Sequence, residues 1–454
     1  MKDLRHLLLL FLITTLMAIT PMSMWAAHDE PANNEIWYTT NNGAKILPDM
    51  KRWKANITSI KFDKDKKCWI MTFDADVTSI GSRAFHNCSS LHSITLPNSL
   101  VKIEGGAFEF CTSLTGIILP SQVRIIGEGA FSGCTALASA YIPNSVDSIG
   151  NYAFTGCKAI ASVTIPQKMT KVGNGIFADC SSLASIKIPN NVTEIGEMAF
   201  LGCTSLSSIR IPNGVTNIGE SAFAFCSSLT SIKLPNSVET IGDMAFVECS
   251  SLTSIDVPKG VMRIGDETFA GCKSLTTVTL PNTINKIGWW AFKNCSSLTS
   301  IFIPHFVASV GEEAFLGCTS LASITISSNT RSIGKKAFVN CYVESSKLTN
   351  HTTFDLTKYG LVIIDKEQED GLLIKGDTAI ACRASATVVN IPVDVTYIAS
   401  RAFKNCKSLV SLTVPTSILK IGEGAFEDCH IEKSNLVNRS SFSLSKYGMK
   451  IINR

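Results

Sequence analysis

The sequence predicts an α+β repeat solenoid: a right-handed superhelix with a parallel β-sheet on its concave face and short helical turns on its convex face. Cysteine recurs every 23 residues through most of the 454-residue chain, and apolar, proline and glycine positions keep the same period. Apolar residues make up 45% of the chain. Because a single unit cannot bury its own apolar side chains, neighbouring units must stack on one another.

The spacing of the cysteines carries the strongest signal. A strict period of this size is typical of stacked structural repeats and not of a disulfide framework. The main run then breaks, and one further pair repeats the same step. The cysteines that keep the step are Cys88, Cys111, Cys134, Cys157, Cys180, Cys203, Cys226, Cys249, Cys272, Cys295, Cys318 and Cys341, followed by Cys406 and Cys429.

The unit Cys180–Cys203 shows the internal pattern. Leu183–Ile188 ends in apolar and polar alternation, which predicts a short strand with one buried face. Pro189 ends the strand because proline lacks a backbone N–H. Gly196 permits a tight bend or a positive φ, and Glu197–Gly202 is predicted to be one short helical turn.

In such a stack the cysteines form an inner ladder, with equivalent atoms of adjacent strands about 4.8 Å apart. A disulfide needs Cβ atoms roughly 3.8 Å apart, and stacked units hold their Cβ vectors parallel. We therefore predict buried free thiols that pack as small apolar side chains. Disulfides between pairs of units and the binding of a soft metal are the alternatives, although no C-x-x-C motif supports a metal site.

Units such as VTEIGEMAFLGCTSLSSIRIPN (Val192–Asn213) resemble the BspA-like leucine-rich-repeat family of bacterial secreted and cell-surface proteins. The resemblance covers roughly Val77–Cys429, and Asn34–Thr39 (NEIWYT) looks like the leader that precedes such arrays. It implies a leucine-rich-repeat superhelix. It also implies a role in attachment to host proteins or to other cells.

The non-repetitive segments divide the chain into six parts. A solenoid needs caps over the apolar faces of its terminal units, and the tryptophan-rich leader is predicted to be one. The segments after Cys341 and Cys429 align without a gap at an offset of 88 residues, which predicts one capping element used twice. The parts are a signal peptide (1–27), an N-terminal capping leader (28–73), the main array (74–341), an irregular junction or cap (342–371), a short second array (372–429) and a C-terminal cap (430–454).

The first part predicts export. Lys2 and Arg5 precede the apolar run Leu7–Ile19, which is shorter than the ~20 residues that a membrane span needs. Cleavage is expected near Ala27, so the protein is predicted to be secreted or held at the cell surface. The alternative is an uncleaved anchor. No later segment is predicted to cross a bilayer.

The sequence also predicts a hairpin between the two arrays and the length of the concave face. Leu361–Ile364 and Leu372–Ile374 flank a polar turn and are predicted to form a hairpin. Counting the second array, about fifteen units stack into a concave face some 70 Å long.

In each strand, the side chains five and seven positions after the cysteine point away from the core. The fifth position is serine in most units, whereas the seventh carries Lys187, Arg210 and Lys233 in consecutive units. These three should stack as a basic stripe about 10 Å long. Like charges opposite one another destabilise a sheet, so a run kept despite that cost indicates an anionic partner. The alternative is a solvated row neutralised by counter-ions.

Four aromatic residues are further candidates for ligand binding. Tyr141 and Phe302 occupy the seventh position and should be exposed on the same face as the basic stripe. Trp289 and Trp290 follow a turn glycine, where most units have small or charged residues. Exposed aromatic rings are typical interface anchors or sugar-stacking platforms. The alternative is that at least one tryptophan folds over a neighbouring unit.

No catalytic motif is found. The seven histidines form no H-E-x-x-H pattern, and G-x-S-x-G and P-loop motifs are absent. A net charge of +4 favours neither nucleic acid nor an acidic membrane as a partner. We therefore predict an exported, monomeric binding protein without metal or cofactor, whose ligand is a protein or glycan on a host or neighbouring cell. A structural or self-associating surface scaffold is the alternative.

Overall fold

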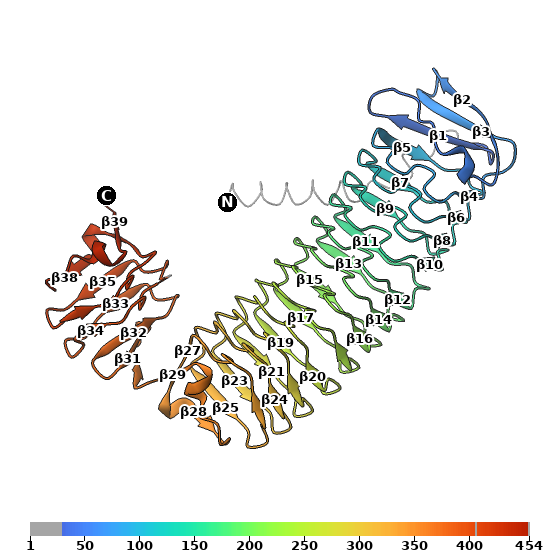
Figure 1. Cartoon of the computed structure of the whole chain (residues 1–454). Coiled ribbons are helices and arrows are strands. Elements are labelled where there is room, and N and C mark those ends of the chain that lie inside the picture. The colour runs from blue at the N-terminus through green and yellow to red at the C-terminus, as the bar shows by residue number, and fades with distance from the viewer. Residues whose placement is uncertain (1–29, 405, 453–454) are drawn as a thin grey trace, which may run out of the picture.

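The computed structural model describes residues 30–404 and 406–452, which form a β-solenoid of about 16 turns. Figure 1 shows the turns following one another from the N-terminal leader to a bend, after which a shorter array turns back. Neighbouring turns are parallel and in register at the sequence period, as in the pairing of Ser162 with Ser185. The predicted signal peptide lies outside the described residues.

The first ladder of strands lies on the inner side of the bend in the main array (Figure 1). In β15, Ile209 is buried between the exposed Ser208 and Arg210, as the alternating pattern predicts. The strands are β5 (Leu91–Thr95), β7 (Gly116–Ile118), β9 (Ser139–Tyr141), β11 (Ser162–Thr164), β13 (Ser185–Lys187), β15 (Ser208–Arg210), β17 (Ser231–Lys233), β19 (Ser254–Asp256), β21 (Thr277–Thr279), β23 (Ser300–Ile303) and β25 (Ser323–Ile326), with β33 (Val388–Asn390) and β35 (Ser411–Val414) in the second array.

A second ladder of two-residue strands lies on the outer side of the bend. Each unit contributes one strand after its proline turn, and neighbouring strands pair in parallel, as β14 does with β16. The sequence pattern does not predict this ladder. The strands are β4 (Ser79–Ile80), β6 (Lys102–Ile103), β8 (Ile125–Ile126), β10 (Ser148–Ile149), β12 (Lys171–Val172), β14 (Glu194–Ile195), β16 (Asn217–Ile218), β18 (Thr240–Ile241), β20 (Arg263–Ile264), β22 (Lys286–Ile287), β24 (Ser309–Val310) and β26 (Ser332–Ile333), with β34 (Tyr397–Ile398) and β36 (Lys420–Ile421) later.

The predicted helical turns do not form, so the helical part of the α+β class is wrong. Within residues 30–404 and 406–452, the only helices are short 3₁₀ turns outside the regular units. In the stretch Glu197–Gly202, Met198 and Gly202 have φ of 54° and 68°, which interrupts any right-handed helix. The Phe200 N–H donates to the Ala222 carbonyl of the next unit at 2.9 Å. Bonds to the next unit therefore alternate with single turn bonds, such as Leu201 N–H to the Met198 carbonyl, and no continuous helix forms.

The core is a set of columns that run along the solenoid. The phenylalanine rings stack on one another, with the centroids of Phe108 and Phe131 at 5.2 Å and their planes 4° apart. Beside them lie the cysteines as free thiols. Cys134 Sγ donates to the Phe108 carbonyl at 3.1 Å, and the same contact recurs along the ladder. The thiols thus pack as the sequence predicted, and those from Cys111 to Cys341 each also donate to a buried carbonyl.

Burial changes the titration of these thiols. It raises the pKa of Cys180 from 9.0 to about 12. Between these values the unfolded chain releases a proton that the folded chain keeps, so stability falls as pH rises. We expect Cys180→Ala to remove about 1.4 kcal/mol of the loss in unfolding free energy between pH 7 and pH 10. Denaturant unfolding of both proteins at the two pH values checks this, and equal losses would contradict it.

One unit carries an unpaired polar group in this core. Thr268 is fully buried where neighbouring units have Ala245 and Ala291, and its hydroxyl has no hydrogen-bond partner. An unpaired buried hydroxyl costs about 1–3 kcal/mol, and loss of its methyl costs about 0.8 kcal/mol. We therefore expect Thr268→Ala to stabilise the chain by about 1 kcal/mol in denaturant unfolding. Thr253→Ala is the control, because that hydroxyl donates to the Thr230 carbonyl and its removal should not stabilise.

The N-terminal leader extends the first ladder. Its strands are β1 (Glu35–Thr40), β2 (Ile57–Asp63) and β3 (Cys68–Phe73), with a 3₁₀ turn η2 (Met50–Arg52). β1 pairs antiparallel with β3 on one side and with β5 on the other. Trp53 meets the first ring of the phenylalanine column, Phe85, edge-on at 5.6 Å between centroids. The leader therefore covers the sheet edge and the aromatic core of the first unit.

The two segments related by the 88-residue offset fold alike. In the first, β28 pairs in parallel with β25 and β29 with β27; in the second, β38 pairs with β35 and β39 with β37. Each segment therefore adds a strand to the first ladder of its own array. The elements are β27 (Cys341–Glu344), η3 (Ser345–Lys347), β28 (Leu348–Asn350), η4 (Leu356–Tyr359) and β29 (Leu361–Ile364), then β37 (His430–Glu432), η5 (Lys433–Asn435), β38 (Leu436–Asn438), η6 (Leu444–Tyr447) and β39 (Lys450–Ile452).

The predicted hairpin between Leu361–Ile364 and Leu372–Ile374 is wrong. β29 is taken up by the capping element, where it pairs with β27. β31 (Leu372–Lys375) pairs instead with β30 (Lys366–Glu367) and with β32 (Thr378–Cys382), antiparallel to both. β32 then pairs in parallel with β34, which starts the second array.

The two arrays have separate hydrophobic cores, one ending at Leu361 and the other beginning at Leu372. Only a small buried cluster of Ile364, Leu373 and Ala381 lies between them. The contact between the arrays therefore buries little apolar surface, and polar contacts matter more there than inside either array.

Candidate binding surface

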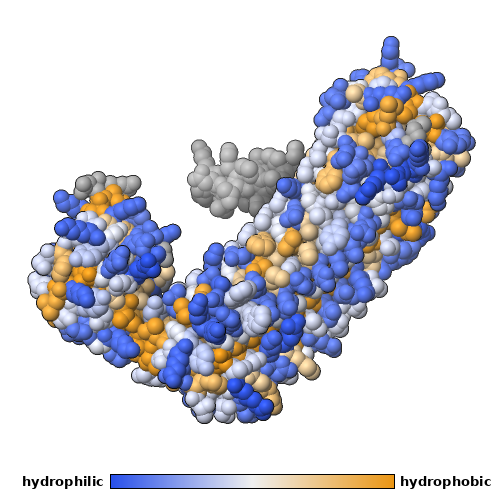
Figure 2. Space-filling model, viewed as in Figure 1, coloured by the Kyte–Doolittle hydropathy of each residue, from blue (hydrophilic) through white to orange (hydrophobic). Residues whose placement is uncertain are grey.

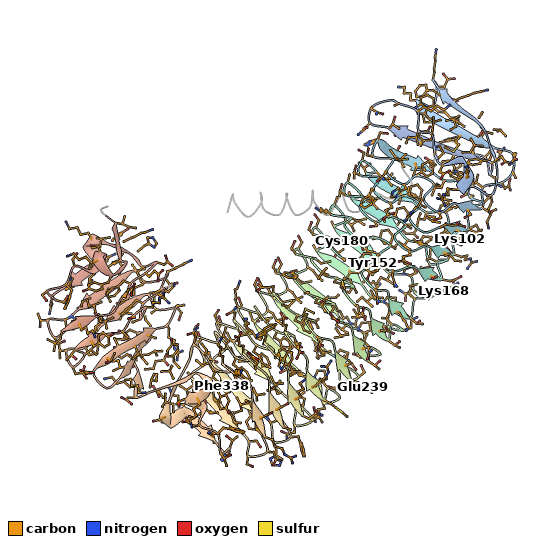
Figure 3. The ribbon with its side chains drawn as sticks, in the orientation of Figure 1. Lys102, Tyr152, Lys168, Cys180, Glu239 and Phe338 are labelled. Atoms are coloured by element: carbon orange, nitrogen blue, oxygen red, sulfur yellow. The ribbon has the colours of Figure 1, made fainter. Side chains whose placement is uncertain are left out.

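The predicted basic stripe forms on the strand face. Lys187, Arg210 and Lys233 are exposed on β13, β15 and β17, and Arg210 lies directly opposite Lys233. None of the three makes an ion pair with any residue that the structure describes. By contrast, several lysines on the outer side of the bend have partners, as in Lys168 with Asp147 at 2.8 Å and Lys171 with Glu194. Figure 3 shows Lys168 on that outer side, with Lys102 and Glu239.

Hydroxyl groups border the stripe, and they divide into two kinds. Four positions after the cysteine, threonine hydroxyls donate to the carbonyl of the preceding unit, as Thr253 does to Thr230 at 3.2 Å. One position later, Ser185, Ser208 and Ser231 are exposed, and their side chains have no hydrogen-bond partner within the described residues. These serines therefore offer free donors and acceptors to a ligand.

The exposed aromatic residues of the strand face lie far apart. Tyr141 and Phe302 are each 55% exposed, as predicted from their position. They are seven units apart in the stack, roughly 34 Å, so the structure does not bring them into one site. Ile118 lies directly opposite Tyr141 in the register and is also exposed, so the two form a small apolar patch beyond the basic stripe.

The two tryptophans differ in their surroundings. Trp290 Nε1 donates to Glu313 of the next unit at 3.0 Å, and Lys293 Nζ lies 4.8 Å from the centre of its ring. Trp289 is 59% exposed, and its backbone N–H donates to Asp266. Both lie beyond the second ladder and not on the strand face. Trp290 is thus held by its neighbours, whereas the ring of Trp289 faces solvent.

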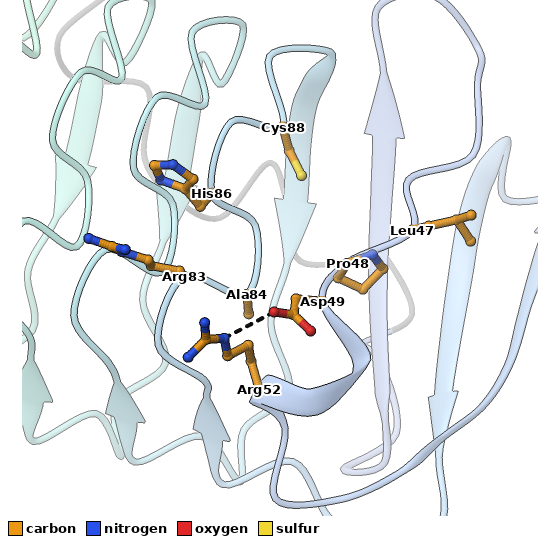
Figure 4. Close-up of a pocket in the computed structure, with 8 residues that line it drawn as sticks. All are labelled: Leu47, Pro48, Asp49, Arg52, Arg83, Ala84, His86 and Cys88. Carbon is orange, nitrogen blue, oxygen red and sulfur yellow. Dashed lines mark hydrogen bonds and ion pairs between the residues drawn. The ribbon is translucent and has the colours of Figure 1, made fainter.

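A cavity of about 440 Å³ lies between the leader and the first unit (Figure 4). The sequence analysis did not predict it, since only folding brings the leader onto this unit. Asp49 pairs with Arg52 at 3.0 Å, and Glu109 lies 3.1 Å from the ring of His86. Asp49 therefore balances the charge of Arg52, whereas Arg83 has no ion-pair partner among the described residues. The lining residues of the cavity are Leu47, Pro48, Asp49, Arg52, Arg83, Ala84, His86 and Cys88.

Groups suited to metal binding do not gather in the described part of the chain. No three His, Cys, Asp or Glu side chains within 30–404 and 406–452 come together as ion ligands. Burial raises the pKa of the partly exposed Cys88 to about 11, which keeps this thiol protonated at neutral pH. In the same ranges, no helix has the length and apolar character to cross a membrane.

Comparison with known proteins identifies the repeat. The family model for the BspA type leucine rich repeat region matches residues 55–184, 147–265, 239–358 and 376–449, which together span most of the chain. The chain belongs to this family. No curated protein matches the sequence.

Solved structures that resemble this BspA-type chain are also leucine-rich-repeat proteins. One from Bacteroides ovatus is 31% identical with a TM-score of 0.45, and the match covers 66% of this chain and 90% of that one. A leucine rich cell surface protein from Faecalibacterium prausnitzii is 31% identical with a TM-score of 0.43, covering 63% and 83%. A leucine-rich-repeat protein of T. pallidum is 26% identical with a TM-score of 0.27, covering 58% and 87%.

Exposed residues that the sequence analysis did not select also lie on the BspA-type repeats. Ile118 occupies the same position as Tyr141 one unit earlier, so the rule that selected Tyr141 also applied to it. Asn190, Asn213 and Asn236 follow the proline of the three basic units, and all are exposed. Figure 2 shows other apolar patches, at the leader and near the junction of the arrays.

Proposed function

We propose that the chain is an exported binding protein that attaches to protein or glycan on a host or neighbouring cell through its strand face, without catalysis. The observation that carries this proposal is the basic stripe, in which three cations of consecutive units lack partners, whereas Lys168 and Lys171 on the outer side are paired. Membership of the BspA-type family also supports the proposal, because the resemblance to that family implies attachment. The predicted signal peptide supports export.

A self-associating scaffold is the second candidate, and the two capping elements bear on it. In the first copy, Tyr342 and Val362 pack against the second array. In the second copy the equivalent residues are His430 and Lys450, both exposed. The second copy therefore lacks the two apolar contacts by which the first copy meets another array, which favours a monomer.

Binding of purified residues 28–454 to arrays of matrix proteins and glycans tests the proposal. Lys187→Glu, Arg210→Glu, Lys233→Glu as a triple variant should lose binding while circular dichroism stays unchanged. Trp289→Ala is the matched surface variant, since its ring faces solvent on another side. Loss in that variant alone would move the site to the tryptophan. No binding, together with self-assembly in analytical ultracentrifugation, would favour the scaffold.

A further inference from the structure

Three consecutive units present the same three exposed side chains. Each carries a serine, a cation and an asparagine, five, seven and ten positions after its cysteine. None of the nine side chains has a hydrogen-bond or ion-pair partner among the described residues, and each row steps by about 4.8 Å. The rows are Ser185, Ser208 and Ser231; Lys187, Arg210 and Lys233; and Asn190, Asn213 and Asn236.

Negative charge is kept away from this surface. From Leu91 to Asn236, no strand of the first ladder and no proline corner that follows one carries a carboxylate, and the next strand of that ladder carries Asp256. The acids of these units lie on or beyond the second ladder, as Glu197, Glu220 and Asp243 do. Lys187 and Arg210 therefore have no acid beside them on the strand face, and Asp256, in the unit next to Lys233, forms no ion pair with it.

The repeat of the surface suits a polymer. Equal rows of hydroxyl, cation and amide match a ligand that repeats acidic and hydroxyl groups along its length, parallel to the solenoid axis. Peptides that bind sheets usually add a strand to a free edge or fill pockets with alternate side chains. The strands of this surface lie inside the ladder, and the cavity lies at the leader instead. The ring of Tyr141, two units or about 10 Å from Lys187, is free to stack on a sugar.

We propose that the strand face of these units binds a linear acidic glycan, a polysaccharide carrying carboxylate or sulfate groups, laid along the stack. This inference rests on the proposed function and names its ligand class. The cations contact the acidic groups, the serine and asparagine side chains bond to sugar hydroxyls, and Tyr141 stacks on one ring.

The test uses heparin oligosaccharides as the acidic glycan, poly-L-glutamate as an acidic peptide and dextran as a neutral glycan. Calorimetry at two salt concentrations measures each affinity for residues 28–454. Lys187→Ser, Arg210→Ser, Lys233→Ser should weaken heparin binding roughly ten-fold and flatten its salt dependence. The matched control is Lys286→Ser, Arg331→Ser, Lys335→Ser, which removes the same charge from unpaired cations away from the strand face. It should change the affinity less than two-fold.

Tyr141→Ala separates the two acidic polymers. It should weaken heparin binding and leave poly-L-glutamate binding unchanged. If poly-L-glutamate binds as well as heparin and Tyr141→Ala changes neither affinity, the ligand is an acidic peptide and the proposal of a glycan is wrong. Equal losses of heparin affinity in the two triple variants would mean that net charge alone determines binding, and they would also overturn the proposal. If heparin fails while matrix or cell binding persists, the inference fails alone; if both fail, the proposed function fails with it.

Discussion

Gly242→Ala is expected to destabilise the main array by about 3 kcal/mol, although it adds only one carbon. A Cβ on Gly242 would lie 2.4 Å from the backbone nitrogen of Glu220 and 2.6 Å from the carbonyl carbon of Gly219. Both are backbone atoms of the preceding unit, so no side chain can rotate away. The two units would have to separate, which would weaken the stacked core on both sides.

Gly214→Ala is the matched control for this prediction. Its Cβ would meet the Val192 carbonyl at 3.4 Å, an ordinary contact, and its φ is not positive. We expect a change within about 0.5 kcal/mol. Because a long array can unfold in more than one step, hydrogen exchange of units 226–272 should be read beside thermal unfolding. Equal behaviour of the two variants would contradict the close-contact argument.

Close contact between units also explains Gly196, for which the sequence allowed either a tight bend or a positive φ. A Cβ on Gly196 would lie 2.9 Å from the backbone nitrogen of Asn174 and 2.9 Å from the carbonyl carbon of Gly173, and its φ is not positive, so close approach and not backbone freedom requires glycine there. Positive φ occurs later in the unit, at Met198, where a side chain is present. A period within one sequence shows that a residue recurs, but not which neighbouring unit it touches.

The solenoid, its strand face and its inner thiol ladder could be predicted because each depends on a pattern within one unit. Alternation in Leu183–Ile188 is enough to orient Lys187 outward. The second ladder could not be predicted in the same way. A strand of two residues, such as β14, has no periodicity to read, and only pairing with the next unit defines it.

The candidate site was predictable to the same extent. The exposure of Lys187 follows from alternation, but its lack of a partner depends on where the acids of neighbouring units lie. The tryptophans show the limit most clearly. Trp289 and Trp290 are adjacent in sequence, but they differ: the ring of Trp289 faces solvent. Trp290 donates a hydrogen bond to Glu313, which lies 23 residues away and is brought close because the units stack.

Arg383→Met is expected to detach the second array from the first, at a cost of about 3–5 kcal/mol. Arg383 is 6% exposed and pairs with Glu367 at 2.7 Å. Its guanidinium also donates to the backbone carbonyls of Thr319 in the main array and of Tyr342 in the capping element that follows it. Methionine keeps the apolar stem but leaves these acceptors and one carboxylate without their cation.

Because the two cores are separate, the loss should be local. In hydrogen exchange, amides of the second array and of β31 should lose protection, while the main array around Phe200 keeps its own. Arg401→Met removes an exposed arginine whose ion pair with Glu427 is 3.8 Å long, and it should cost less than about 1 kcal/mol. A uniform loss across both arrays would mean that they unfold as one unit, and no loss would mean that the small apolar cluster of Ile364, Leu373 and Ala381 holds them together without the arginine.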